Sequence, residues 1–462
     1  MALLLLLLLL LLSSFAISAD SSAASRRLLH FFPFDFPFHA FHFGFEPDYE
    51  PVESHEAVAA APPPPHPRMQ RAHSALQAWK RAIVSDPTNF TSNWVGDDVC
   101  SYNGVFCAPA LDDPSLHVVA GVDLNGAGLA GRLPDEIGRL ADAAILHLNS
   151  NRFAGPLPDT LSDLALLHEL DLSNNNFSGP FPQSVLRLPG LKYLDLRFND
   201  FHGPLPPELF DRDLDALFLN DNRFDSRIPE NFGNIKASAV VLANNKFTGC
   251  VPRSVGRMRS TLNEIVLSNN ELTGCLPPEI GSLTRLTVLD VSQNFLSGGL
   301  PESFSRLKDI EQLNLAHNTL VGAVPDWACR LERLENLSVS DNYFTRVASS
   351  CRERSGDVAF DDVNNCLSGV IGQKLAAECA APVLSGFSVC GGPPRSVPLP
   401  PSSLDVRAFV SPPPLPPPPR PKCVPAPRSA PLPPPSSFGV LPPVGGIQYA
   451  SPPPPLPIFN GY

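Results

Sequence analysis

Carboxylate side chains recur along this chain at intervals that would place them side by side. Asp123, Asp171, Asp195 and Asp290 each stand between the two apolar residues of a short repeated segment. Two carboxylates at a fixed separation can hydrolyse a glycosidic bond, whereas a row of carboxylates attracts a cationic ligand. The elements that carry these aspartates decide which chemistry applies.

One column of asparagines accompanies these aspartates. Its members, which follow one another every 23 to 25 residues, are Asn151, Asn175, Asn199, Asn222, Asn245, Asn270, Asn294, Asn318 and Asn342. The clearest copy of the repeated segment reads LDLSNNNFSGPFP over residues 170–182. A period of 20–29 residues with this consensus is the leucine-rich repeat pattern. Ten copies are present; the first has Ala127 in the asparagine position, and the last lacks the trailing Gly and Pro.

The residue types of the repeat predict how each copy folds. Apolar pairs such as Leu170 and Leu172 point to one side of a short strand, so the residue between them points to the other side. A buried asparagine can satisfy the backbone groups that the following turn leaves unpaired. One coil cannot bury its own apolar face, so the coils must stack. The sequence therefore predicts an α/β repeat solenoid with ten leucine-rich repeats.

Composition divides the chain into six segments. We expect a signal peptide at 1–19, a disordered Phe/His/Pro-rich linker at 20–68, an N-terminal cap at 69–117, ten repeats at 118–346, a Cys-containing C-terminal cap at 347–392 and a Pro-rich tail at 393–462. The apolar run at 3–12, followed by small residues, is typical of a signal peptide. No second run of about 18 apolar residues exists, so we expect no membrane span and exclude a transmembrane receptor kinase.

Ten cysteines in a chain with a signal peptide indicate disulfides. The cysteines that we assign to disulfides are Cys100, Cys107, Cys250, Cys275, Cys329, Cys351, Cys366 and Cys379. Cys250 and Cys275 occupy the same slot of adjacent coils, about 5 Å apart, and this suits a disulfide. Cys329 and Cys351 lie in nearly matching slots. The sequence leaves open how Cys366, Cys379, Cys390 and Cys423 pair.

Other motifs lack the context that their chemistry needs. The GxGxxG at 126–131 ends on the repeat glycine, and Pro134 breaks the helix that a dinucleotide loop requires. The cysteine pair of the N-terminal cap lacks the further ligands of a zinc site. Asp171 and Asp195 could mimic a glycosidase pair, but they would stand on an open surface. We therefore expect no enzymatic activity, no cofactor and no metal site.

The repeats, the sequence Asn364-Asn365-Cys366 behind them and the Ser-Pro-rich tail together resemble the leucine-rich repeat extensins. The segment 263–280, NEIVLSNNELTGCLPPEI, is especially similar. The resemblance implies a plant-type, right-handed superhelix in the cell wall. It also implies that the repeat domain binds small basic peptides of the rapid-alkalinisation-factor type and that the tail joins wall polysaccharides such as pectin. Within the tail, only 451–455 is a complete Ser-Pro-Pro-Pro-Pro block.

The strand register predicts which side chains form the concave face. The candidate peptide-binding residues are Asp123, His147, Glu169, Asp171, Tyr193, Asp195, Phe198, Phe218, Asp221, Glu264, Asp290 and Asn314. Acidic and aromatic side chains dominate this set, so we expect a basic peptide as ligand. The net charge of −12 argues against a nucleic-acid partner. Sequons at Asn89, Asn176 and Asn336 predict N-glycosylation.

Two other functions stay open at this stage. Polygalacturonase-inhibiting proteins are also secreted, plant-type and built from ten repeats, but they lack the Pro-rich tail and the Asn-Asn-Cys sequence. A purely structural role in the wall is a third hypothesis. The sequence does not fix the oligomeric state, so a homodimer is one of the open states.

Overall fold

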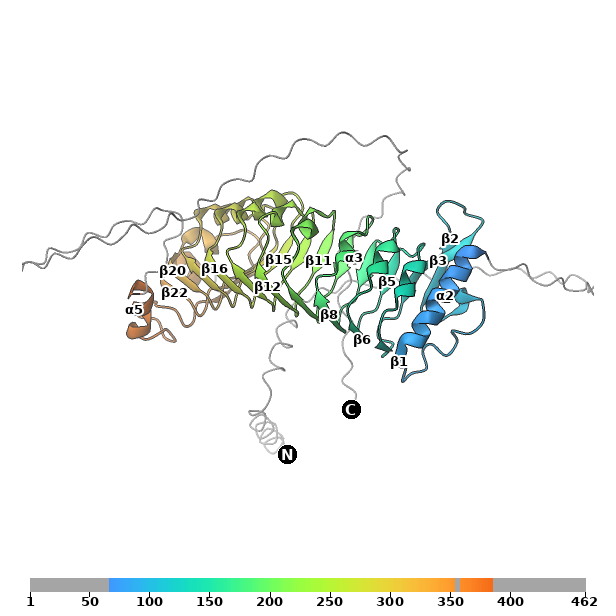
Figure 1. Ribbon diagram of the computed structural model, residues 1–462. Helices are drawn as coiled ribbons and strands as arrows, with labels where there is room; N and C mark the ends of the chain where they lie inside the picture. The colour runs from blue at the N-terminus through green and yellow to red at the C-terminus, as the bar shows by residue number, and fades with distance from the viewer. Residues whose placement is uncertain (1–65, 354–357, 385–462) are drawn as a thin grey trace, which may run out of the picture. The chain divides into compact units, whose positions relative to one another are not determined.

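The computed structural model describes residues 66–353 and 358–384, which lie within one compact unit at 61–401. These residues form a stack of coils that runs from the N-terminal cap to the C-terminal cap (Figure 1). The predicted signal peptide, linker and Pro-rich tail lie outside the described residues, as do Cys390 and Cys423. Among the described residues, no helix has the length and apolar character needed to cross a bilayer.

A sheet of twelve short strands lines the inner side of the stack. In spatial order its strands are β2 (Val105–Pro109), β3 (His117–Asp123), β5 (Ile145–His147), β7 (Glu169–Asp171), β9 (Tyr193–Asp195), β11 (Ala216–Phe218), β13 (Ala239–Val241), β15 (Glu264–Val266), β17 (Val288–Asp290), β19 (Gln312–Asn314), β21 (Asn336–Ser338) and β23 (Ala359–Asp361). All neighbours pair in parallel except β2 and β3. Leu146, Leu170 and Leu194 stand in register, so one strand per repeat repeats the same side-chain rows.

A second sheet of eleven strands runs beside the first. Its strands are β1 (Ile83–Ser85), β4 (Ala130–Gly131), β6 (Arg152–Gly155), β8 (Asn176–Pro180), β10 (Asp200–Gly203), β12 (Arg223–Arg227), β14 (Lys246–Gly249), β16 (Glu271–Cys275), β18 (Phe295–Gly298), β20 (Thr319–Val324) and β22 (Tyr343–Val347). The repeat pattern does not predict this sheet, because its strands contain the glycines that turn the chain.

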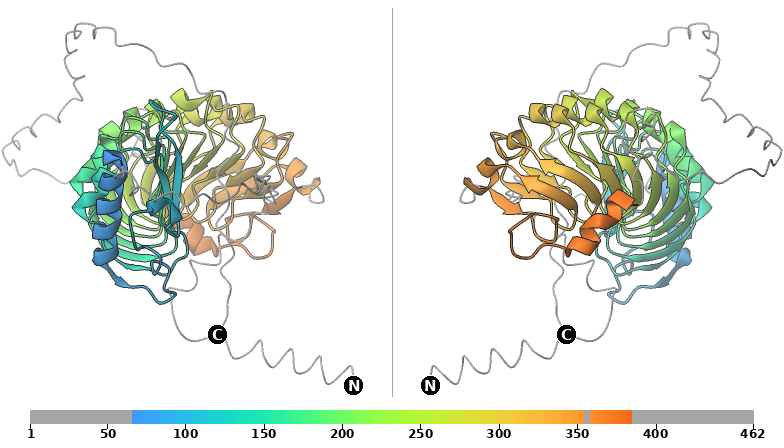
Figure 2. Two further views of the ribbon diagram at one scale, coloured as in Figure 1. Left: turned by 90° about the vertical axis from the view of Figure 1, so that its right-hand side faces the viewer. Right: turned by 90° about the vertical axis from the view of Figure 1, so that its left-hand side faces the viewer.

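Short helical turns close each coil on the outer side of the arc (Figure 2). They are η3 (Asp135–Arg139), η4 (Asp159–Asp163), α3 (Gln183–Leu186), η5 (Pro207–Asp211), η6 (Phe232–Asn234), η7 (Arg253–Met258), η8 (Pro278–Ser282), η9 (Glu302–Arg306) and η10 (Asp326–Cys329). Most begin directly after a proline, which occupies the N-cap position in the extended conformation. The architecture is the predicted leucine-rich repeat solenoid.

The asparagine column forms a continuous hydrogen-bond ladder. The Asn175 side chain donates through Nδ2 to the carbonyls of Leu172 and Ser173 in its own coil, and to Leu148 in the previous coil. Its Oδ1 accepts the backbone N–H of Phe153 at 2.9 Å. One side chain therefore satisfies turn groups of two coils at once, as a buried turn requires.

The ladder is one rung longer than the sequence analysis predicted. Asn365, which was assigned to the C-terminal cap, is fully buried and donates to Val339 O, Asp362 O and Val363 O. Its Oδ1 accepts the N–H of Phe344 at 3.0 Å. The C-terminal cap therefore begins with an eleventh coil, whose strand is β23.

Phenylalanines fill the interior beside the leucine pairs. Phe153 and Phe177 stack with their ring centroids 6.3 Å apart, and Phe224 stacks on Phe201 and Phe247 at 6.2 and 6.4 Å. All five are fully buried. Because burying one such side chain contributes about 2–3 kcal/mol, this column helps to hold each coil on its neighbours.

The N-terminal cap covers the first coil with a helix and two tryptophans. The helix α2 (Pro67–Ala82) begins the cap and ends before Ile83, which pairs with Gly131 of β4. Trp79 and Trp94 are fully buried and contact each other edge to face. The turn η2 (Val99–Ser101) and the disulfide Cys100–Cys107 complete the cap.

Two disulfides stabilise the C-terminal end, and a predicted third bond is wrong. Cys329 is bonded to Cys351 and Cys366 to Cys379, close to α4 (Ser349–Glu353) and α5 (Ala376–Leu384). Cys250, however, is a free and exposed thiol.

Strand register explains why Cys250 and Cys275 do not pair. Gly249 of β14 stands opposite Leu272 of β16, so the position after it, Cys250, falls two residues short of Cys275. The sequence suggested equivalent positions because both cysteines lie ten residues after the first apolar residue of the inner strand in their repeat. The second sheet, which carries Cys275, has a different register between these two coils. Cys275 is itself disulfide-bonded, but not to Cys250.

Removing one rung of the ladder should destabilise the protein strongly. Asn294 donates to three carbonyls and accepts the N–H of Leu272. We expect Asn294→Ala to lower the free energy of unfolding by roughly 2–4 kcal/mol, because buried backbone groups lose their partners. Gln293→Ala is the matched control, since Gln293 is the adjacent residue in the chain and its side chain is exposed. Urea unfolding of the secreted chain measures both; equal losses would contradict the role of the ladder.

Thiol labelling checks the corrected disulfide assignment. Alkylation of the native, unreduced chain followed by peptide mapping should modify Cys250 and leave Cys275 unmodified until reduction. Cys250→Ser should remove that label without shifting the thermal unfolding midpoint. A peptide in which Cys250 and Cys275 stay linked under non-reducing conditions would restore the original assignment.

Candidate functional site

The inner sheet presents three zones along the stack. The last residue of each strand is acidic or polar on β3 to β9, apolar on β11 to β15, and polar again on β17 to β21. In spatial order, these strand-end residues are Asp123, His147, Asp171, Asp195, Phe218, Val241, Val266, Asp290, Asn314 and Ser338. The expected acidic face therefore covers only part of the sheet.

Several of the strand-end aspartates have a structural task. Asp171 Oδ1 accepts the N–H of Ser173 at 2.9 Å and its hydroxyl at 2.6 Å. Asp290 binds Ser292 in the same way, and Asp123 accepts the N–H of Asn125. Such side-chain turns end a strand where the chain must leave the sheet. One carboxylate oxygen of each aspartate therefore accepts a hydrogen bond within its own turn. These aspartates stabilise the fold in addition to placing negative charge on the surface.

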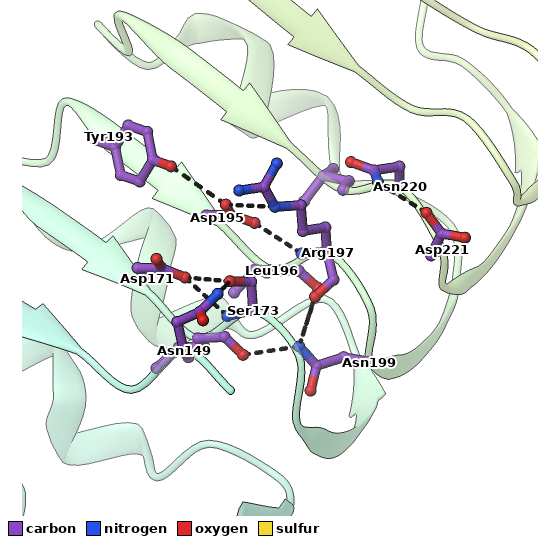
Figure 3. Close-up of polar contacts among 12 residues, drawn as sticks. Asn149, Asp171, Ser173, Tyr193, Asp195, Leu196, Arg197, Asn199, Asn220 and Asp221 are labelled. Atoms are coloured by element: carbon purple, nitrogen blue, oxygen red, sulfur yellow. Dashed lines mark hydrogen bonds and ion pairs between the residues drawn. The ribbon is translucent and has the colours of Figure 1, made fainter. Parts of the chain in front are cut away.

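Asp195 departs most from its predicted place. It is fully buried, whereas the sequence analysis expected it to face a ligand. Its Oδ2 contacts Nε of Arg197 at 2.9 Å and the hydroxyl of Tyr193 at 3.2 Å, and its Oδ1 accepts the N–H of Arg197 (Figure 3). Burial raises the pKa of this carboxyl to about 7, although Arg197 opposes the shift. Asp195 is therefore a partner of Arg197 and not a free acidic group.

Arg197 is held between this carboxylate and an aromatic pair. Its guanidinium lies 5.2 Å from the centre of the Phe218 ring, a cation–π distance. The rings of Tyr193 and Phe218 are 5.7 Å apart, and burial raises the pKa of the Tyr193 hydroxyl. These two aromatic residues thus stand together on the inner sheet, at the border of the acidic and apolar zones.

Phe198 and Asp221 do not belong to the strands. Each directly precedes a ladder asparagine and has a positive φ, 52° and 55° respectively. Asp221 accepts hydrogen bonds from Asn220 and Asn244, and burial raises its pKa. Both residues lie beyond the ends of the strands, at the strand-end edge of the sheet. They therefore do not belong to the inner surface, where the sequence had predicted them.

His147 joins two carboxylates in the acidic zone. Its Nε2 lies 3.1 Å from Glu169 Oε2, and its Nδ1 lies 4.0 Å from Asp123 Oδ2. Burial opposes protonation, but the hydrogen bond and charge of Glu169 outweigh it and raise the pKa of His147. Protonation of this imidazole will reduce the net negative charge of the zone as pH falls.

Glu264 is an isolated carboxylate within the apolar zone. Its in-register neighbours are Ala239 and Val288, and burial raises its pKa. No side chain among the described residues forms an ion pair or hydrogen bond with its carboxylate. Half-buried charged groups normally have such a partner, so Glu264 is the group of this face that most lacks a cation.

Metal and glycosidase chemistry gain no support from the geometry. The described residues contain no group of three or more His, Cys, Asp or Glu side chains that could hold a metal ion. Asp171 and Asp195 are neighbours, but Asp195 is buried and bound by Arg197 and Tyr193.

The three sequon asparagines, Asn89, Asn176 and Asn336, are exposed in the structure. Asn336 opens β21, so a glycan there would cover the C-terminal end of the inner sheet. Glycosylation at all three positions stays a prediction.

Comparison with known proteins assigns the repeats. The model described as "Leucine rich repeat" matches 143–201 and 284–344, a second leucine-rich repeat model matches 261–283, and "Leucine rich repeat N-terminal domain" matches 73–108. Pollen-specific leucine-rich repeat extensin-like protein 3 of Arabidopsis thaliana is 74% identical over 156 residues, covering 34% of this chain and 22% of the relative. Leucine-rich repeat extensin-like protein 2 of the same plant is 54% identical over 227 residues, covering 49% and 29%.

The chain belongs to the leucine-rich repeat extensin family. It spans less than a third of the length of these leucine-rich repeat extensin relatives. Among solved structures, the Arabidopsis receptor kinase HAESA, in complex with the peptide hormone IDA and the co-receptor SERK1, aligns with a TM-score of 0.53 and 26% identity, covering 64% of this chain and 54% of that one. A plant ice-binding protein aligns with a TM-score of 0.52 and 28% identity, covering 67% and 97%.

The raised pKa of Asp195 predicts a pH-dependent contribution to stability. An unfolded aspartate has a pKa of about 3.9, whereas the folded value is about 7. Between these values only the folded state keeps the proton, so this group lowers the free energy of unfolding as pH rises from about 4 to 7. Asp195→Asn should remove that decline, and the variant should gain stability relative to the parent over the same range.

Urea unfolding at pH 4, 5.5 and 7 measures this effect. Asp135→Asn, at an exposed position of η3, is the control and should follow the parent. If the difference between Asp195→Asn and the parent stays constant with pH, then Arg197 keeps the carboxylate ionised and the expected shift is wrong.

Proposed function

We propose that this protein is a secreted cell-wall protein whose inner sheet binds a small basic peptide with apolar side chains. The peptide is of the rapid-alkalinisation-factor type, and the protein uses it to regulate wall assembly and cell growth. The Pro-rich tail connects the repeat domain with wall polymers, pectin among them.

Glu264 is the observation that carries the peptide proposal. It is a half-buried carboxylate without a partner among the described residues, and its flanking residues Ala239 and Val288 are apolar. A lysine or arginine of a bound peptide would supply the missing charge, and its aliphatic stem would lie on the apolar neighbours. Neutral, purely apolar ligands would leave this carboxylate unpaired at a high cost.

The adjoining zones suit the remainder of such a peptide. Val241 and Val266 are half-buried in the middle of the sheet; Val241 stands in register with Phe218, and Val266 with Val241. Glu169 and Asp171 provide negative charge two strands before Phe218. Charge attracts the ligand and sets its register, while aromatic and aliphatic contacts supply most of the affinity.

Peptide binding by similar folds supports the proposal. The aligned HAESA structure holds the peptide hormone IDA. The alternative function is inhibition of microbial wall-degrading enzymes. An inhibitor would bind a folded enzyme, whereas the proposed function requires a peptide ligand.

Removing two carboxylates without changing shape tests the peptide site. Glu264→Gln with Asp171→Asn keeps the side-chain volumes and keeps an acceptor for the Ser173 N–H. We expect the double variant to bind a rapid-alkalinisation-factor peptide at least roughly tenfold more weakly, which is about 1.4 kcal/mol. Calorimetric titration at low and physiological salt measures the effect, which should shrink at higher salt.

The matched control removes two carboxylates from the outer side. Asp135→Asn with Glu136→Gln changes the same net charge within η3 and should leave binding intact. Equal weakening by both variants would indicate a general charge effect. Undiminished binding by the inner-face variant would remove the proposed site, and capture of a polygalacturonase instead of a peptide would favour the inhibitor.

A further inference from the structure

A row of polar side chains follows the strand-end edge of the inner sheet. Each of these residues directly precedes a ladder asparagine and has a φ between 52° and 55°. They are Asp221, Asn244, Asn269, Gln293, His317, Asp341 and Asn364. Most are bonded from coil to coil. Asn244 donates to Asp221 at 2.9 Å and Asn269 to Asn244 at 2.8 Å, while His317 lies 3.3 Å from Asp341.

The row is interrupted at Gln293. This side chain is exposed, and no hydrogen bond joins it to another described residue. Asn269 on one side and His317 on the other are bonded only to members that lie further away along the row. Asn269, Gln293 and His317 therefore lie on consecutive coils beside one groove, and each has a donor or acceptor that no described residue uses.

The surface is hollowed at this interruption. An open groove of about 580 Å³ is lined by Asn269, Glu271, Gln293, Phe295 and His317, with ladder asparagines beneath. We call these five residues the flank groove. It lies between the ends of β15 and β17 and the starts of β16 and β18, away from the peptide site on the inner sheet.

Phe295 is the unusual member of the flank groove. It opens β18, and its side chain is 58% exposed, while the next residue, Leu296, is fully buried. Its in-register neighbour on β16 is Thr273. A large exposed aromatic ring in a polar hollow is typical of a binding site and has no role in the core.

The chemistry of the flank groove fits a neutral sugar chain. The face of an aromatic ring is electron-rich and attracts the C–H groups of a pyranose ring. Amide and imidazole groups can both donate to and accept from hydroxyls. No lysine or arginine lines the groove, and Glu271 adds a carboxylate, so an acidic polysaccharide such as polygalacturonate would be repelled.

The repeat of the coils adds a geometric match. Parallel strands stand about 4.8 Å apart, so polar groups recur along the stack at a distance close to the length of one sugar residue. We infer that the flank groove binds a neutral, β-1,4-linked oligosaccharide that runs along the stack, with Phe295 under one ring and Gln293 between two coils.

Titration of the secreted full-length chain with cellohexaose tests the inference, with an oligogalacturonate of equal length as the acidic comparison. We expect the parent to bind cellohexaose and to bind the oligogalacturonate at least tenfold more weakly. Phe295→Ala should weaken cellohexaose binding at least tenfold, and Gln293→Ala should weaken it several-fold. Because both side chains are exposed, the unfolding midpoints should stay unchanged, and circular dichroism checks this.

Phe106→Ala is the matched control. Its ring is 59% exposed, as Phe295 is at 58%, but it lies at the N-terminal end of the inner sheet. This variant should bind cellohexaose like the parent. Absence of cellohexaose binding, a preference for the oligogalacturonate, or equal losses in Phe295→Ala and Phe106→Ala would each overturn the inference. Peptide titration of Phe295→Ala should match the parent, so failure here is distinct from failure of the peptide site.

Discussion

Every coil depends on the same interaction, in which a buried asparagine side chain satisfies the backbone of two successive turns. Asn175 binds carbonyls in its own coil and the previous one, and accepts an N–H of that previous coil. Coils held in this way cannot slide against one another without exposing unpaired polar groups in the interior. The side-chain rows of the inner sheet are therefore in fixed register, and a ligand can read several strands at once.

The acidic residues of the inner sheet illustrate how a fold and a surface share the same groups. Asp171 and Asp290 end their strands by accepting from the serine two residues later, and each keeps one oxygen for other contacts. In Asp195 both carboxylate oxygens are bonded, by Arg197 and Tyr193. Counting aspartates thus overstates the charge that is available to a ligand. Glu264, which stands outside this turn position, has no such task.

The two proposed sites use different sides of one repeat. The inner sheet presents charged and apolar side chains from the first and last residues of its strands, which suits a peptide. The strand-end edge presents amides, an imidazole and one exposed aromatic ring, which suits sugar hydroxyls and a pyranose ring. Since the repeat offers both rows in every coil, substitutions in one row leave the ladder and the other row intact. A wall protein could in this way hold a peptide and a polysaccharide together.

The fold follows from the sequence because each repeat encodes it locally. The leucine pairs, the asparagine and the Gly-Pro turn each act within one coil or between adjacent coils, so their period predicted the solenoid and its ladder. Asn365 was not counted in the asparagine column because the leucine pair before it is replaced by Phe360 and Asp362. The Cys250–Cys275 pairing failed for a related reason: the register of the second sheet depends on how neighbouring coils are offset, and a count along the chain does not contain that offset.

The site was predicted less completely than the fold. Alternation along a strand tells which side chains point outward, and it placed Tyr193, Phe218 and Glu264 correctly on the inner sheet. It cannot tell which outward side chain is covered by its neighbours: Asp195 is buried because Arg197 and Tyr193 of the same strand region fold over it. The sequence by itself determined the stack, its period and the residue rows. Only the tertiary structure decided which charges are free, because burial and pairing depend on contacts among several coils.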